Sequence, residues 1–203
     1  MAKIIYLSIL VNVCLCVAKV IIYVFTQSSL ILTDAVDSLL NACVLLLNLY
    51  HPGFTPLINY SAIASYRVAY LFVSIDALVK QQLLDAALIL LISSCVMLGV
   101  GIVLMILQIL SSEFSNKKMV VIATINDNSS TLGAIISSSV GYAAGDPKAA
   151  GIIDNSLNLA ICAFFIFFSV NQIIHMVGKD LRPVSTTTKD VPLSSDPDIP
   201  KNF

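Results

Sequence analysis

Charged residues are scarce in this chain of 203 residues: they make up 11% of it, whereas 58% of the residues are hydrophobic. The mean hydropathy is +0.92. A soluble domain of this length does not need so much apolar material to fill one core, so the composition excludes an ordinary soluble enzyme and a disordered chain. An excess of basic charge is also lacking, because 11 Lys and Arg stand against 12 Asp and Glu. We therefore expect no nucleic-acid partner.

Two further patterns are missing from the sequence. The chain has only two histidines, and no HxxxH or HExxH spacing that would place zinc ligands on one helix. The alternation of apolar and polar residues that is typical of membrane barrel strands is absent too. Only helices and closed barrels can satisfy their backbone hydrogen bonds in lipid, so the missing barrel pattern leaves helices as the expected structure.

Long apolar segments dominate what is present. A helix of about 20 apolar residues crosses a hydrocarbon core roughly 30 Å thick, and the chain has six segments of this kind. They are residues 4–24, 30–49, 62–79, 86–110, 120–143 and 152–177. We predict an all-α membrane protein, a bundle of six transmembrane helices within residues 1–180, with the lipid bilayer around it and no large soluble domain. The third segment is the weakest, since it contains Arg67 and Asp76, and a five-span alternative without it stays open.

The basic residues of the short loops predict the orientation. Six spans place one group on one side of the membrane, namely Lys3, Lys117, Lys118, Lys179 and Arg182. Only Lys80 and Lys148 fall on the other side, so the positive-inside rule predicts that both termini are cytosolic. The alternative is that the first span is a cleaved signal peptide. Residues 181–203 hold four of the seven prolines and predict a disordered cytosolic tail.

Acidic residues fall inside the second apolar segment. An ionised side chain at the centre of a membrane helix costs about 2.5 to 3.5 kcal/mol on insertion scales, so each needs a partner or a purpose. Asp34, Asp37, Ser38 and Asn41 follow the spacing i, i+3, i+4 and i+7 and share one stripe of the helix. Two carboxylates one turn apart repel each other unless a proton or a cation lies between them.

The fifth segment repeats this pattern. Asn126 and Ser130, like Asp127 and Thr131, are four residues apart. If the two helices are neighbours, their oxygens form a small cavity suited to a divalent cation and to proton exchange on the carboxylates. The alternative is that these side chains make hydrogen bonds that only hold the bundle together.

Four other charges lie in or beside the apolar segments. We expect Lys19 to extend to the membrane surface or to neutralise Asp34 or Asp37. Arg67 and Asp76 are nine residues apart, and we expect each to find a different partner or to lie near the membrane surface. Asp154 lies at the start of the sixth segment, where a helix N-terminus favours a carboxylate, and we predict that it caps that helix.

The segment SLILTDAVDSLLN at residues 29–41, followed by a long apolar run, resembles the second helix of the cation diffusion facilitators. These proteins are six-helix transporters of zinc and manganese. The resemblance implies metal ligands at Asp37 and Asn41. It also implies ligands from the fifth helix, either Asn126 and Ser130 or Asp127 and Ser130.

The last span strengthens this resemblance. Residues 153–156, IDNS, open an apolar helix that closes with IHMV at residues 174–177. This layout is similar to the branch of the superfamily named transmembrane protein 163, whose short members lack the large cytoplasmic metal-binding domain and are similar to zinc-exporting vesicle proteins.

Together, these features predict a transporter and no enzyme. The expected activity is export of a divalent cation from the cytosol in exchange for protons, with zinc as the first candidate and manganese or another divalent cation as alternatives. We expect a homodimer in vesicles, endosomes or lysosomes, or in the plasma membrane. Asp37 would be the main ligand, with Asp34, Asn41 and the fifth-span oxygens completing the shell. The alternative function is that of an adaptor or accessory subunit with a degenerate ion site, which binds another transporter or channel and transports nothing itself.

Overall fold

The computed structural model describes residues 3–51, 55–111 and 117–180, and every element in these ranges is a helix. The helices are α1 (Lys3–Thr26), α2 (Ser29–Tyr50), α3 (Thr55–Val79), α4 (Ala87–Leu110), α5 (Lys117–Ala144) and α6 (Pro147–Asp180). The predicted all-α fold is confirmed for these residues. The tail predicted at residues 181–203 lies outside them.

Two helices begin earlier than the apolar pattern predicts, because proline is tolerated in the first turn of a helix. α3 begins at Thr55, with Pro56 as its second residue, instead of at residue 62. α6 begins at Pro147 instead of residue 152. Asp146 caps α6, since its Oδ1 accepts hydrogen bonds from the backbone N–H groups of Lys148 (2.9 Å) and Ala149 (3.1 Å).

Five of the helices are long and apolar enough to cross a membrane: α1, α2, α3, α4 and α6. α3 qualifies even with Arg67 and Asp76 inside it, and it is the least apolar of these five helices, as the sequence predicts for the third segment. α5 has 28 residues, and the part of it from residue 121 on has no stretch of the same apolar character. Its polar run at residues 126–131, NDNSST, lowers its apolar character.

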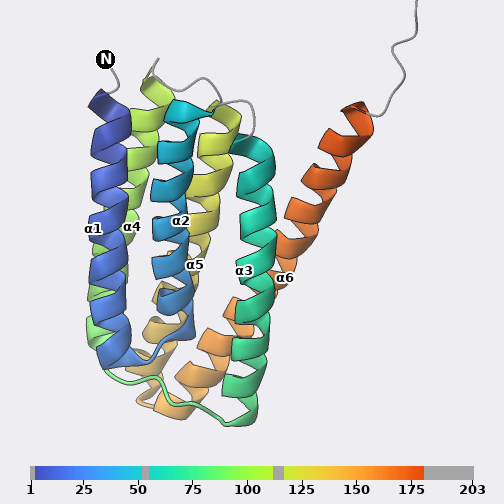
Figure 1. The fold of residues 1–203 in the computed structure, drawn as a ribbon. Helices are drawn as coiled ribbons and strands as arrows, with labels where there is room; N and C mark the ends of the chain where they lie inside the picture. Colours follow the sequence, from blue (N-terminus) through green and yellow to red (C-terminus); the bar gives the residue numbers. More distant parts are fainter. Residues whose placement is uncertain (1–2, 52–54, 112–116, 181–203) are drawn as a thin grey trace, which may run out of the picture.

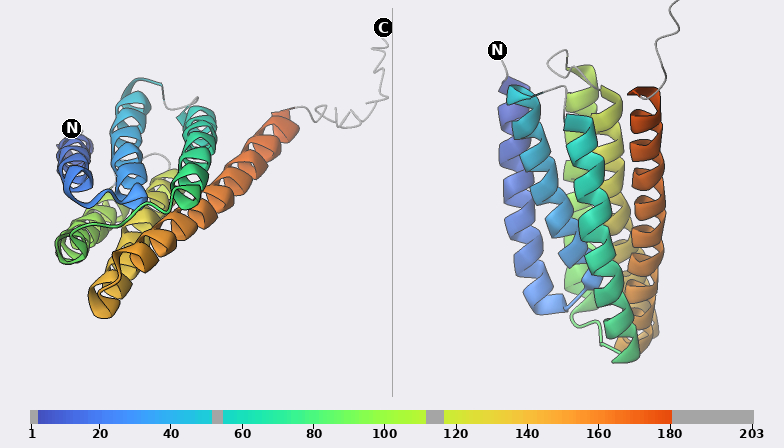
Figure 2. Two further views of the ribbon diagram at one scale, coloured as in Figure 1. Left: turned by 90° about the horizontal axis from the view of Figure 1, so that it is seen from below. Right: turned by 45° about the vertical axis from the view of Figure 1, so that its right-hand side comes forward.

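The six helices form two rows of three, which Figure 2 shows from below: α1, α2 and α3 in one row, and α4, α5 and α6 in the other. α2 packs on α1 and α5, whereas α3 packs mainly on α6. The C-terminal half of α6 leans away from the other helices (Figure 1). The start of α1 and the end of α6 lie at the same end of the bundle, as the prediction of both termini on one side requires.

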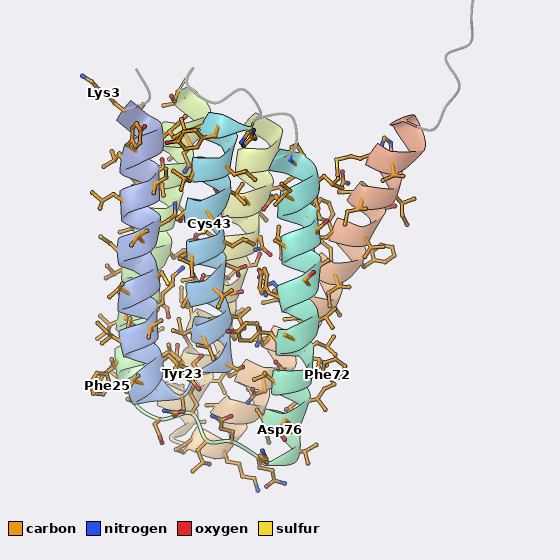
Figure 3. The ribbon with its side chains drawn as sticks, viewed as in Figure 1. Lys3, Tyr23, Phe25, Cys43, Phe72 and Asp76 are labelled. Carbon is orange, nitrogen blue, oxygen red and sulfur yellow. The ribbon has the colours of Figure 1, made fainter. Side chains whose placement is uncertain are left out.

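The outer surface is apolar and the interior is unusually polar. Phe25 and Phe72 point outward from α1 and α3 (Figure 3) and are 62% and 65% exposed. Leu30, Ile31 and Leu90 form a small apolar core between α1, α2 and α4. Charged and polar side chains fill much of the remaining interior. This distribution is the reverse of that in a soluble protein and is consistent with an integral membrane protein.

Candidate functional site

A cluster of five charged side chains lies inside the bundle. Four helices contribute to it, with Lys19 from α1, Asp34 and Asp37 from α2, Arg67 from α3 and Asp127 from α5. Each of these residues is at most 4% exposed. The stripe predicted on α2 and the polar run of α5 therefore face each other. The cluster divides into two halves, one around each basic side chain.

Lys19 is at the centre of the first half. Its Nζ donates hydrogen bonds to Oδ1 of Asp34 at 2.7 Å, to Oγ of Ser38 at 2.7 Å and to Oδ1 of Asp127 at 3.1 Å. A weaker bond of 3.4 Å reaches the backbone oxygen of Asp34. Thr131 donates to the second carboxylate oxygen of Asp34. The predicted alternative in which Lys19 neutralises Asp34 is thus confirmed.

Arg67 is at the centre of the second half. Its Nη2 donates to Oδ2 of Asp37 at 2.6 Å and to Oδ1 of Asn126 at 2.9 Å. Nδ2 of Asn126 in turn donates to Oδ1 of Asp37 at 2.6 Å. Ser130 completes this half, with its Oγ 3.4 Å from Oδ2 of Asp37. Both oxygens of Asp37 are therefore occupied by protein donors.

Aromatic rings also contact the guanidinium of Arg67. Its Cζ lies 5.2 Å from the ring centre of Tyr66 and 5.3 Å from that of Phe165. These are cation–π distances. The Nε atom of Arg67 is buried and has no hydrogen-bond partner in the described part of the chain. Arg67 also donates to Oγ of Ser130 at 3.3 Å and to Sγ of Cys162 at 3.7 Å, so its guanidinium has polar and aromatic partners at once.

Of the six predicted ligands, five meet in the cluster: Asp34, Asp37, Asn126, Asp127 and Ser130. Asn41 is buried one turn further along α2, but none of the hydrogen bonds that hold the cluster in the described ranges includes it. Asp76 lies outside the cluster, near the lower end of α3 (Figure 3), and pairs with Lys80 at 2.6 Å in an exposed position.

Sequence reasoning missed the pairing of Arg67 with Asp37. The two residues are thirty positions apart on different helices, so no local spacing indicates the contact. The available signal was the high cost of an arginine in an apolar segment, which requires a buried partner. That cost predicts that a partner exists without saying which acid it is.

The prediction that Asp154 caps its own helix was wrong, because α6 begins seven residues earlier, at Pro147. The Asp154 carboxylate is buried and accepts hydrogen bonds from the hydroxyls of Ser28 (2.7 Å), Ser29 (3.0 Å) and Ser137 (3.0 Å). It also accepts from the backbone N–H of Leu30 at 3.3 Å. Asp154 therefore stabilises the N-terminus of α2 from the neighbouring helix.

Carboxylate, amide and hydroxyl oxygens surround the two positively charged groups of the cluster. With all groups ionised, three carboxylates face two basic side chains, which leaves a formal charge of −1. Within the described ranges, no group of three or more His, Cys, Asp or Glu is arranged to hold a metal ion. The ammonium of Lys19 and the guanidinium of Arg67 lie among these oxygens and donate hydrogen bonds to them. The chain matches no protein-family model and no curated protein, so the functional argument depends on the chemistry of this cluster.

Proposed function

We propose that this protein is an integral membrane transporter that moves a divalent cation through the cluster between α2 and α5. The observation that carries the proposal is the burial of the cluster's three carboxylates inside a bundle whose outer surface is apolar. Burying an ionised carboxylate inside a membrane bundle costs free energy, and in membrane proteins such carboxylates mark ion pathways. The resemblance of residues 29–41 to a cation-transporter helix supports the same function and makes zinc the first ion to test.

The depth of the cluster supports transport. Arg67 is the middle residue of α3 (Thr55–Val79), so its contacts with Asp37 and Asn126 are near the middle of the bundle. Substrate sites of secondary transporters lie near the bilayer midplane. A site at this depth can open to either side when the helices that form it tilt. The ion then leaves on the side opposite to the one from which it entered.

The test is ion uptake into proteoliposomes that contain the purified protein. Zinc, manganese and calcium are supplied separately, each with and without a pH gradient, because the sequence predicts proton exchange. We expect saturable uptake of at least one ion by the wild type. Asp37→Asn should lower it by roughly tenfold or more, since it leaves the buried guanidinium of Arg67 without its carboxylate, and this uncompensated positive charge disfavours a cation in the cluster.

Asp76→Asn is the matched control, because Asp76 is an exposed carboxylate of the same bundle and pairs with Lys80. Its uptake should equal that of the wild type. Leak-level uptake by wild type and Asp37→Asn alike would contradict transport.

A second candidate is an accessory subunit that transports nothing. Protein donors already occupy both oxygens of Asp37, which is what a purely structural ion pair requires. In that case Asp37→Asn should destabilise the fold while no ion is taken up by either protein.

A further inference from the structure

The ammonium of Lys19 is surrounded by oxygens in the way a metal ion would be. Four oxygen atoms lie within 3.4 Å of Nζ: one carboxylate oxygen each from Asp34 and Asp127, Oγ of Ser38, and the backbone oxygen of Asp34. Oγ of Ser38 donates its own proton to Oδ1 of Asp127 at 2.9 Å, which leaves its lone pairs free to face the ammonium. We call this group of four oxygens the Lys19 cage.

We propose that the Lys19 cage is a binding site for a hard divalent cation, and that Lys19 is a built-in competitor that fills it in this conformation. This inference rests on the proposed function and names the half of the cluster that receives the ion. Two carboxylates balance the charge of one divalent cation. When the ion enters, the ammonium must withdraw, so the occupancy of the site and the position of Lys19 are coupled.

The chemistry and size of the cage select the ion. All four ligands are oxygens. Such ligands suit hard cations better than they suit zinc. The distances from Nζ to the three nearest oxygens are 2.7, 2.7 and 3.1 Å. Calcium–oxygen distances are about 2.3 to 2.6 Å, whereas those of magnesium and zinc are about 2.0 to 2.2 Å. A cation of calcium size therefore needs the smallest contraction of the cage.

Lys19 is better suited than Arg67 to give way to an ion. Its ammonium is a single point at the end of a flexible four-carbon chain, and it can swing out as one group. The guanidinium of Arg67 contacts Asp37, Asn126 and two aromatic rings at once. Arg67 thus fixes one half of the cluster, while Lys19 leaves the other half available for exchange.

The test replaces Lys19 with methionine, which has a similar length and no charge, and measures thermal unfolding in detergent micelles. The protein is melted in EDTA, and then with CaCl₂, MnCl₂ or ZnCl₂ in place of EDTA. We expect Lys19→Met to melt below the wild type in EDTA and to gain on the order of 5 °C or more in saturating calcium. The gain in zinc should be smaller. The wild type should gain less than about 1 °C, because its own ammonium fills the cage.

Lys80→Met is the matched control, since Lys80 pairs with Asp76 in an exposed position and should give no calcium response. The double variant Lys19→Met/Asp127→Asn keeps one carboxylate in the cage and should lose most of the calcium gain. An equal gain in the double variant, or no gain in Lys19→Met, would overturn the proposal. A larger gain in zinc than in calcium would overturn the choice of ion class.

A second variant covers the case in which Lys19→Met does not fold. Lys19→Gln retains a hydrogen-bond donor for the cage, and calcium present during purification should rescue both variants. If neither variant folds in calcium, the proposal is wrong, because the ion should replace the missing charge. The readout is independent of uptake. If Lys19→Met is stabilised by calcium but the wild type takes up no ion, the cage is supported and transport is refuted. If the wild type takes up an ion but Lys19→Met is not stabilised by calcium, transport is supported and the cage is refuted.

Discussion

Single residues show that a buried carboxylate can have very different surroundings in this protein. Asp37 and Asp34 are neutralised by basic side chains, whereas Asp154 is surrounded by hydroxyls and one backbone N–H and makes no ion pair within the described ranges. Charge-assisted hydrogen bonds of this kind are about twice as strong as neutral ones. Asp154 therefore joins α6 to the N-terminus of α2, a structural role that the ion site does not use.

Replacing Asp154 with asparagine tests this role. The amide keeps the shape but turns an acceptor oxygen into an NH₂ group that faces hydroxyl and N–H donors. We expect a loss of about 1 to 3 kcal/mol in the free energy of unfolding, measured by denaturant titration in micelles. Asp146→Asn should change it by no more than a few tenths of a kcal/mol, since asparagine caps a helix as well as aspartate does. Equal effects of the two variants would refute the assigned role.

The acidic residues of the site could be predicted from the sequence, but their partners could not. The spacing of Asp34, Asp37 and Ser38 places them on one stripe, and the cost of burying them indicates function. The pairing of Asp37 with Arg67, and of Asp127 with Lys19, depends on which helices are neighbours. One sequence does not contain that information. Asp154 was misassigned because Asp146 and Pro147 give the stronger signal for the start of α6.

At the scale of the helices, the apolar pattern predicted where the elements lie better than where they begin. α2 begins at Ser29, one residue from the predicted start, because the hydroxyl of Ser28 caps it by accepting from Ile31 N–H at 3.3 Å. α3 begins at Thr55, seven residues before the predicted start, because Pro56 is tolerated in its first turn. α5 is the least apolar helix for a physical reason: its polar run faces α2 inside the bundle, where hydrophobic residues could not satisfy Asp34 or Asp37.

Close packing between helices gives a prediction at this scale. A Cβ added at Gly141 of α5 would lie 2.7 Å from Cβ of Ala150 in α6 and 3.3 Å from Cβ of Ala87 in α4. Neither alanine can move aside without its helix. We expect Gly141→Ala to lower the free energy of unfolding by about 1 to 3 kcal/mol, as overpacking does. Denaturant titration in micelles measures the loss.

Gly99 in α4 is the matched control, because a Cβ there would meet no atom within 4 Å. Gly99→Ala should be neutral or stabilise the protein by up to about 1 kcal/mol, since alanine is the better helix former. If Gly141→Ala behaved in the same way, the close contact among α4, α5 and α6 would be wrong.

At the scale of the whole molecule, an even number of antiparallel helices brings the start of α1 and the end of α6 to one side. Lys3 lies at the end of the bundle where α6 ends, whereas Lys148 lies in the first turn of α6 at the opposite end (Figures 1 and 3). The apolar outer surface between these ends is consistent with a bilayer around the helices. The sequence predicts that the side with Lys3 is cytosolic.

Cysteine labelling in sealed microsomes, whose outer face is cytosolic, tests this arrangement. The five native cysteines are first replaced with alanine or serine, and a membrane-impermeant maleimide is then applied to Lys3→Cys and Lys148→Cys. Lys3→Cys should react without detergent and Lys148→Cys only after detergent opens the membrane, because the bundle holds the two positions on opposite sides. The reverse pattern would place both termini in the lumen and contradict cytosol-to-lumen export as the direction of transport. Loss of the Lys3→Cys signal with a shortened chain would identify the first span as a cleaved signal peptide, and α1 would then be unable to supply Lys19 to the cage in the mature protein.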